Sequence, residues 1–201
     1  LASISMFFPA VMMLFEDNLK RFIVYGATAQ TGFALMGLAT GSDDGFSSIL
    51  IYFCVYLIMN FGIFAIILSL RQKKQAVDSL RHLAGFSKSH PFLAFSLLVA
   101  IFSMAGVPPF AGFLGKWLIL VSVMEAQLYL LGFIGLVTSC LAAISYLRII
   151  KIMYFDDLLE PLDPGVSNGT QFVIFITLAL LLLFSIMPDP VISAAKVAVS
   201  Y

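Results

Sequence analysis

The sequence predicts an all-α polytopic membrane protein with about six transmembrane helices, one of which is broken between Gly106 and Pro109. Three observations lead to this fold class. Hydrophobic residues make up 61% of the 201-residue chain and charged residues only 11%, whereas soluble domains carry about 25% charged residues. Apolar segments near the ~20 residues that cross a membrane recur along the chain. The basic residues gather in alternate connections between these segments, as expected if each segment crosses the bilayer.

Six apolar segments are long enough to be membrane spans. They cover residues 1–15, 22–40, 46–70, 91–124, 128–149 and 171–187, and a short tail follows at Pro188 and Pro190. The second segment is rich in small and hydroxyl residues, which let helices approach closely, so it is predicted to pack inside a bundle. Residues 1–201 are therefore predicted to form a single transmembrane domain.

Basic residues in the connections predict the orientation of the chain. The positive-inside rule places the first, third and fifth connections on the cytoplasmic side, or on the matrix side of a mitochondrion, and this includes the polar connection 71–90. The opposite side is predicted to hold residues 41–45, Glu125 and the tail with Lys196. Nine of the eleven basic residues lie in the first set: Lys20, Arg21, Arg71, Lys73, Lys74, Arg81, Lys88, Arg148 and Lys151.

The third connection contains an apolar pattern and both histidines. Its residues Val77, Leu80, Leu83 and Ala84 recur at helical spacing, which predicts an amphipathic surface helix that caps the bundle. His82 and His90 both lie here, and His90, which precedes Pro91 at the start of a helix, is interpreted as an interfacial polar residue, with a role in proton entry as the alternative.

Composition also excludes several functions. The net charge is zero, so no basic surface indicates nucleic-acid binding. Cys54 and Cys140 lie far apart in separate apolar runs and are predicted to be small core residues. Without a CxxC motif or a histidine cluster, we expect no metal site and no haem, iron–sulfur cluster or flavin in this chain.

The fourth apolar segment is too long and carries its own interruption. Its 34 residues would form a helix of about 51 Å, against a hydrocarbon core of ~30 Å. Pro108 and Pro109 each lack an N–H group and clash with the carbonyl four residues earlier, while Gly106 and Gly112 add backbone freedom. Irregular backbone at membrane depth needs protein or water around it, so the break is predicted to lie in the bundle interior beside a polar cavity.

Lys116 follows this break and is the candidate for proton transfer. It lies seven residues after Pro109 and is followed by eight mostly apolar residues before Glu125, which is too deep for an end anchor by position alone. An interior lysine costs about 2.5–3.5 kcal/mol on insertion scales, which favours a functional role over snorkelling to the surface. Unlike a guanidinium group, a buried amine can release and regain its proton.

Three segments together resemble one family. The motif SMAGVPPFAGFLGKWLIL, with LKRFIVYGATAQTGFALMGLATG before it and YLRIIKIMYF after it, resembles chain 2 of NADH:ubiquinone oxidoreductase. Chain 2 is an antiporter-like membrane-arm subunit of respiratory complex I, called subunit N in bacteria. The resemblance covers essentially the whole chain and follows the distal part of the family. A lysine in the GKW context favours chain 2 over chain 4, while chain 5 and the multisubunit Na⁺/H⁺ antiporters stay open.

The resemblance implies a function that the residues alone do not. The chain would be the C-terminal half of an antiporter-like inverted-repeat bundle, in a subunit of H⁺-translocating NADH:ubiquinone reductase that couples quinone reduction to proton transfer through Lys116. FMN, iron–sulfur clusters and quinone are expected in other subunits. The expected partners are neighbouring membrane-arm subunits, including antiporter-like ones, lipid, and a proximal-half polypeptide or an unseen upstream region. The expected location is the mitochondrial inner membrane, or alternatively the bacterial plasma membrane.

One residue departs from the family pattern, and other functions remain open. Gln30 stands where a histidine is common, and because an amide does not titrate, a proton-relay role at that site is in doubt. One alternative function is a subunit of a cation/proton antiporter or membrane hydrogenase complex of the same fold. A structural scaffold without pumping is another, although such a scaffold would gain nothing from keeping the broken helix and the buried lysine.

Overall fold

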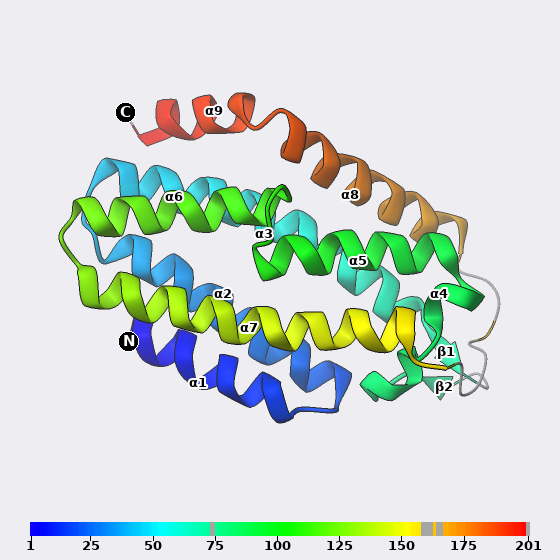
Figure 1. Cartoon of the computed structure of the whole chain (residues 1–201). Coiled ribbons are helices and arrows are strands. Elements are labelled where there is room, and N and C mark those ends of the chain that lie inside the picture. Colours follow the sequence, from blue (N-terminus) through cyan, green and yellow to red (C-terminus); the bar gives the residue numbers. More distant parts are fainter. Residues whose placement is uncertain (73–74, 158–162, 164–166, 200–201) are drawn as a thin grey trace.

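A computed structural model describes residues 1–72, 75–157, 163 and 167–199 of the chain. Long helices lie side by side in an elongated bundle, and the chain turns at its two ends (Figure 1). The helices of the bundle are α1 (Ala2–Phe15), α2 (Leu19–Leu38), α3 (Asp43–Ser69), α5 (Pro91–Ala105), α6 (Ala111–Glu125), α7 (Tyr129–Phe155), α8 (Asn168–Ile186) and α9 (Asp189–Val199).

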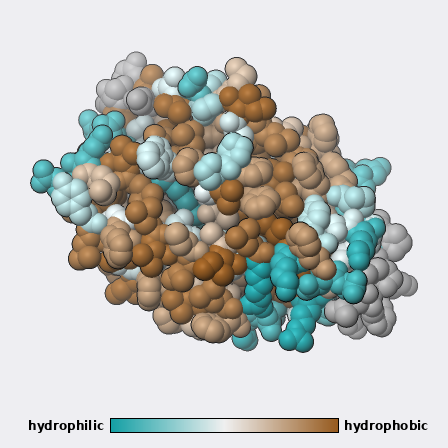
Figure 2. Space-filling model, viewed as in Figure 1, coloured by the Kyte–Doolittle hydropathy of each residue, from teal (hydrophilic) through white to brown (hydrophobic). Residues whose placement is uncertain are grey.

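The predicted all-α membrane fold is confirmed, including the break in the fourth span. Among the described residues, α3, α7 and α8 are long and apolar enough to cross a membrane, and α1 and α5 are apolar but shorter. Helices α5 and α6 together occupy the predicted span 91–124. Apolar residues cover much of the middle of the face seen in Figure 2, and hydrophilic residues gather toward its ends. The chain is therefore a multi-pass membrane protein.

Polar caps explain where two of the spans begin. The Asn18 side chain accepts a hydrogen bond from the backbone N–H of Arg21, and α2 therefore starts three residues before the predicted residue 22. The Ser42 hydroxyl accepts from the N–H of Gly45 and starts α3 in the same way. One face of α2 is buried as predicted, with Gly32 packed closely against the backbone of Ser5 and Met6 in α1. Its other face, with Val24, is exposed.

The third connection differs from its predicted amphipathic helix. It contains strands β1 (Arg71–Gln72) and β2 (Gln75–Ala76), which pair antiparallel, then a 3₁₀ turn η1 (Leu80–Leu83) and a short helix α4 (Phe86–Ser89). The apolar residues at positions 77, 80, 83 and 84 are buried as the spacing suggested. Gly85 has a left-handed φ of 67° and separates η1 from α4, so the two short turns do not form one continuous helix.

The prediction that both cysteines are core residues was wrong. Cys54 and Cys140 are both exposed on the surface of this chain and do not belong to its core. Helix α7 covers the predicted span 128–149 and continues six residues beyond it, to Phe155. Arg148 donates to the carbonyl of Leu14 at 2.9 Å and pairs with Asp17, which joins the end of α7 to the connection between α1 and α2.

Candidate functional site

The break between α5 and α6 starts with a left-handed glycine and two residues that cannot donate hydrogen bonds. Helix α5 ends at Ala105, and Gly106 has a φ of 76° while its N–H bonds to the carbonyl of Ser103 at 3.0 Å. In a continuous helix the carbonyl of Met104 would accept from the N–H of residue 108. Pro108 has no N–H, so the Met104 carbonyl is left free for other donors.

Ser103 joins the two half-helices on the other side of the break. Its hydroxyl oxygen accepts a hydrogen bond from the N–H of Gly112, in the first turn of α6, at 2.8 Å. A Cβ atom on Gly112 would collide with the carbonyl of Ser103, so only glycine allows this approach. The rings of Phe102 and Phe110 stack across the break with their centroids 5.4 Å apart. The break is therefore an ordered connection that these contacts between α5 and α6 hold in place.

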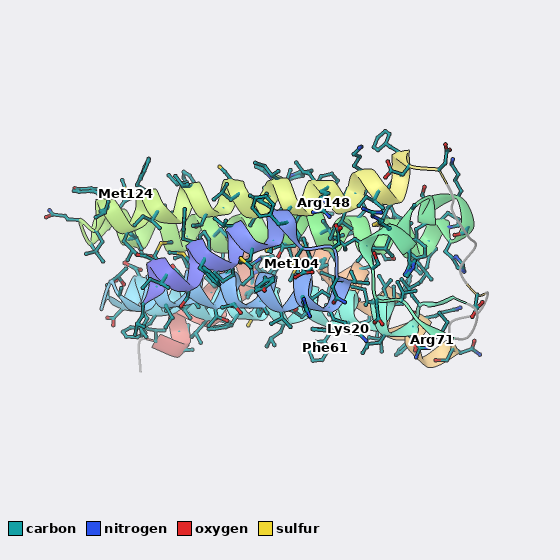
Figure 3. All side chains as sticks on the ribbon, turned by 90° about the horizontal axis from the view of Figure 1, so that it is seen from below. Lys20, Phe61, Arg71, Met104, Met124 and Arg148 are labelled. Carbon is teal, nitrogen blue, oxygen red and sulfur yellow. The ribbon has the colours of Figure 1, made fainter. Side chains whose placement is uncertain are left out.

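Lys116 fills the space next to the break. Its side chain is only 5% exposed, and Nζ donates to the freed Met104 carbonyl at 2.8 Å. Nζ also lies 3.4 Å from the hydroxyl of Ser139 in α7 and 5.2 Å from the ring centroid of Phe33 in α2. A Cβ at Gly106 would come within 3.0 Å of Lys116 Cδ. Met104 lies near the middle of the long axis of the bundle (Figure 3), so the amine is far from both ends.

The amine is held by neutral groups. No ion pair in the described part of the chain includes Lys116, and its contacts are a carbonyl, a hydroxyl and an aromatic face. A buried ammonium group with no counter-charge is costly, because the surrounding groups replace only part of its hydration. The hydroxyl of Ser139 can accept from an ammonium or donate to a neutral amine. The site can therefore satisfy the nitrogen in both protonation states.

Gln30 and Tyr52 complete the buried polar network around the same carbonyl. Gln30 is 3% exposed and its Nε2 donates to the Met104 carbonyl at 3.3 Å, beside the bond from Lys116. The hydroxyl of Tyr52 donates to Gln30 Oε1. Gly115 allows α6 to pack closely on Tyr52, since a Cβ there would lie 3.0 Å from the ring. Side chains from α2 and α6 thus meet on one backbone oxygen of α5, and Tyr52 of α3 joins them through Gln30.

The cavity that reaches this network is not the polar one that the sequence predicted. It has a volume of about 30 Å³ and lies between α2, α3, α5 and α7. Apart from Tyr146, its walls are formed by apolar side chains that extend from Met104 to Leu83, in the third connection. A space of this size could hold a water, but apolar walls offer water few partners. The site is therefore closed by apolar groups toward the end of the bundle that holds η1.

The structure brings some of the predicted site residues together and separates others. Lys116, Gly106 and Gly112 meet at the break, as described above. Pro108 and Pro109 are exposed on the surface of this chain, while the last residues of α5 and the first residues of α6 on either side of them are buried. That the break lies in the interior of a complete bundle stays a prediction, because this chain alone is described. His82 lies within η1 and His90 directly follows α4, at one end of the bundle, and neither is among the described contacts of Lys116.

The sequence analysis did not identify several residues of the network, although the sequence pattern indicates two of them. The Met104 carbonyl is identified by position, since it is four residues before a proline. Tyr52 lies between Ser48 and Tyr56 on α3 at spacings of four, which places each of these polar side chains next to the following one on the helix surface. Ser139 had no local signal, because only the packing of α7 against α6 brings it to the amine.

Taken together, the broken helix and the uncompensated buried lysine define a class: a multi-pass membrane protein that keeps an ionisable group inside its bundle. Comparison with known families identifies which one. Residues 1–142 match the family model described as NADH:quinone oxidoreductase/Mrp antiporter, TM. The match covers more than half of the chain, and the chain belongs to this family.

Curated relatives agree with the resemblance to chain 2. The NADH-quinone oxidoreductase subunit N of Paramagnetospirillum magneticum is 42% identical over 194 residues, which cover 96% of this chain and 40% of the relative. The protein of the same name from Rhodospirillum rubrum is 43% identical over 196 residues, which cover 97% and 40%. The chain therefore spans about two fifths of the length of these relatives.

Solved structures share the fold. A chain of respiratory complex I from Thermus thermophilus with bound aureothin superposes with a TM-score of 0.86 and 26% identity, over 97% of this chain and 44% of that one. A chain of the Mrp complex from Dietzia sp. superposes with a TM-score of 0.84 at 16% identity, over 99% and 45%. The second likeness concerns the fold alone.

Proposed function

We propose that this chain forms part of a proton-translocating membrane-arm subunit of an NADH:quinone oxidoreductase, and that Lys116 carries the proton. The observation behind this proposal is the buried amine at the end of a broken helix, held by a carbonyl, a hydroxyl and an aromatic ring. A purely structural cation at this depth would need a counter-charge, and the described residues supply none. Without a counter-charge, the site instead suits a group that loses and regains a proton.

The wider setting follows from the relatives. Residues 1–201 would be the C-terminal half of the subunit, and the proximal half would come from another polypeptide or an upstream region. Electrons would pass through FMN, iron–sulfur clusters and quinone in other subunits of the complex. The relatives named above are bacterial, which supports the plasma membrane, while the mitochondrial inner membrane offers the same respiratory setting. In either membrane we propose that residues 71–90 face the cytoplasm or matrix.

The experiment that tests this function removes the Lys116 amine and keeps a side chain of similar length and volume. In the intact complex, Lys116→Met should abolish most proton pumping in reconstituted vesicles and slow the coupled quinone reduction, while a native gel shows normal assembly. Lys116→Arg should also be impaired, because a guanidinium group stays protonated. Lys151→Met is the matched control, since Lys151 is exposed in the last turns of α7. Normal pumping by Lys116→Met would show that the lysine only anchors the helix.

A second function is supported by the family description and by the Mrp likeness. In this alternative the chain belongs to a cation/proton antiporter or membrane hydrogenase complex, with no link to NADH oxidation. Purification of the complex from native membranes distinguishes the two. Copurifying flavin and iron–sulfur subunits that oxidise NADH support the first function. A complex that exchanges cations for protons without NADH-oxidising subunits supports the second.

A further inference from the structure

The last predicted span is interrupted, as the fourth is. The sixth apolar segment and the tail after it form a pair of half-helices: α8 ends at Ile186 and α9 begins at Asp189. In a continuous helix the carbonyl of Phe184 would accept a hydrogen bond from the N–H four residues later, but Pro188 has none. The two residues between these helices form the α8–α9 junction. The second half-helix therefore starts with a carboxylate.

Two contacts with α3 give the depth of this carboxylate in the bundle. Helix α8 runs opposite to α3 (Figure 1), and a Cβ on Gly62 of α3 would lie 3.0 Å from the hydroxyl of Thr177 in α8. Asp189 comes twelve residues after Thr177, which is about 18 Å of helix toward the start of α3. Nearer that start, Val199 of α9 lines one apolar groove with Leu50 of α3. Both contacts place Asp189 level with the middle of α3.

The arrangement of the whole bundle agrees with this depth. The α8–α9 junction lies near the middle of the long axis, at about the level of the break between α5 and α6 (Figure 1). Helix α3, which is long and apolar enough to cross a membrane, packs against both α8 and α9. Asp189 therefore lies at the depth of the hydrocarbon core and not at the membrane surface.

On this chain the carboxylate is exposed and has no partner. Asp189 is on the outer surface, and no hydrogen bond or ion pair of its side chain is found in the described part of the chain. The residues before it, Ile186 and Met187, are apolar and are 78% and 57% exposed. A carboxylate among lipid tails is costly, and ionisable groups at this depth almost always pair or face a protein interior. This surface is therefore expected to be covered by protein.

The end of a helix explains the residue type but not the depth. A negative side chain in the first turn is favourable because the N–H groups there carry partial positive charge. Asp43 has the same place in the first turn of α3, where it is exposed at the end of the bundle. Asp189 has this place in the middle of the bundle, where water cannot supply the rest of its solvation. A cation from a partner meets that need directly.

The position of α9 and its small side chains fit a helix from another subunit. Helices α8 and α9 form an outer layer over α3, on the opposite side of the bundle from Leu1, where any upstream segment would join (Figure 1). Ala194 and Ala198 are both exposed and are four residues apart on α9. Small residues at this spacing let two helix backbones approach closely in a membrane. A lysine or arginine on the approaching helix would complement the carboxylate.

We propose that the exposed face of α9 that begins at Asp189 is an interface with a transmembrane helix of a neighbouring subunit, and that this helix carries a lysine or arginine that pairs with Asp189 inside the bilayer. The inference rests on the proposed place of this chain in a membrane-arm complex. It does not depend on the role of Lys116 in proton transfer.

The first test identifies the neighbour in the intact complex. The photoreactive amino acid p-benzoylphenylalanine is placed at Ser193, which is exposed one turn after Asp189. Irradiation in native membranes should join this chain to one membrane helix of another subunit, and mass spectrometry of the joined peptide should find a lysine or arginine within about one helical turn of the attachment point. Attachment to lipid alone, to another part of the same subunit, or to a helix without such a residue would overturn the proposal.

The second test changes the charge. Asp189→Asn should lower the fraction of complex that keeps the neighbouring subunit on a native gel by about tenfold or more, because the partner cation is left unpaired. Asp189→Lys should lower it at least as far, and aspartate in place of the partner's basic residue should restore it, which a general folding defect would not allow. Asp43→Asn and Asp43→Lys are the matched controls and should leave the fraction unchanged.

The outcomes separate this interface from the proposed function. Reduced retention in Asp189→Asn with rescue by the exchanged charges supports the interface, even if Lys116→Met pumps normally and the proposed function fails. Unchanged retention in Asp189→Asn and Asp189→Lys rejects the interface and leaves the function of Lys116 untouched. If irradiation yields no product, the charge variants decide against the Asp43 controls, because they need no knowledge of the partner.

Discussion

A glycine with a left-handed backbone controls the space that the lysine amine occupies. Gly106 ends α5 with a φ of 76°, and its missing Cβ leaves room for the Lys116 stem. Both properties are needed at once, since an L-residue in the left-handed region costs about 1–2 kcal/mol. A methyl group here would also press on Lys116 Cδ at 3.0 Å. The residue therefore links the geometry of the break to the position of the amine.

We expect Gly106→Ala to lower the thermal stability of the complex and to reduce pumping as well. Gly41→Ala is the matched control, because Gly41 has a similar φ of 62° but open space around its Cβ position. Gly41→Ala should show the backbone cost of about 1–2 kcal/mol without loss of pumping. Thermal unfolding and vesicle pumping would be measured for both variants. Equal pumping in the two variants would mean that contact with Lys116 does not matter.

At the scale of elements, the break depends on Ser103 as the tie between two half-helices. We expect Ser103→Ala to destabilise the start of α6 by about 1 kcal/mol, as loss of a helix cap does, and to increase hydrogen exchange of the Gly112 amide. Ser96→Ala is the control, because Ser96 is also buried in α5 but bonds only to the Phe92 carbonyl of its own helix. Similar exchange in both variants would contradict the role of Ser103.

The elements of the fold could be predicted from the sequence to a large degree. Each predicted apolar segment coincides with a helix or, for 91–124, with the pair α5 and α6, because bilayer thickness and backbone hydrogen bonding leave few alternatives to helices. The prolines identified the break. Helix ends were less predictable, since caps such as Asn18 and the anchoring of Arg148 depend on local side-chain contacts. The 3₁₀ turn η1 was missed because apolar spacing does not distinguish two short turns from one helix.

At the scale of the whole molecule, the site was harder to predict than the spans. Lys116 could be chosen because a charge at membrane depth is costly. The described residues that contact it come from three other helices, and their meeting point depends on packing between segments far apart in the chain. Ser139 and Phe33 carry no local signal of this role. The exposure of Pro108 and Pro109 in this chain is likewise a property of the packed bundle and not of the motif.

The orientation of the bundle in the membrane is a prediction of the whole molecule. Residues 41–45 and the turn after α6 lie at one end, and the connection that contains β1, β2, η1 and α4 lies at the other (Figure 1). The basic residues Lys20, Arg71 and Arg148 all lie in the half of the long axis opposite to Met124 (Figure 3). The positive-inside rule then places the η1 end in the cytoplasm or matrix.

Cysteine labelling in oriented vesicles tests this orientation. After Cys54 and Cys140 are replaced by serine, an impermeant thiol reagent outside right-side-out vesicles should label Asp43→Cys and Gln127→Cys but not Lys88→Cys, and inverted vesicles should give the opposite result. All three substituted residues are exposed, so accessibility reports the side of the membrane and not burial. Labelling of Lys88→Cys and Asp43→Cys from one side would contradict the crossing of α3.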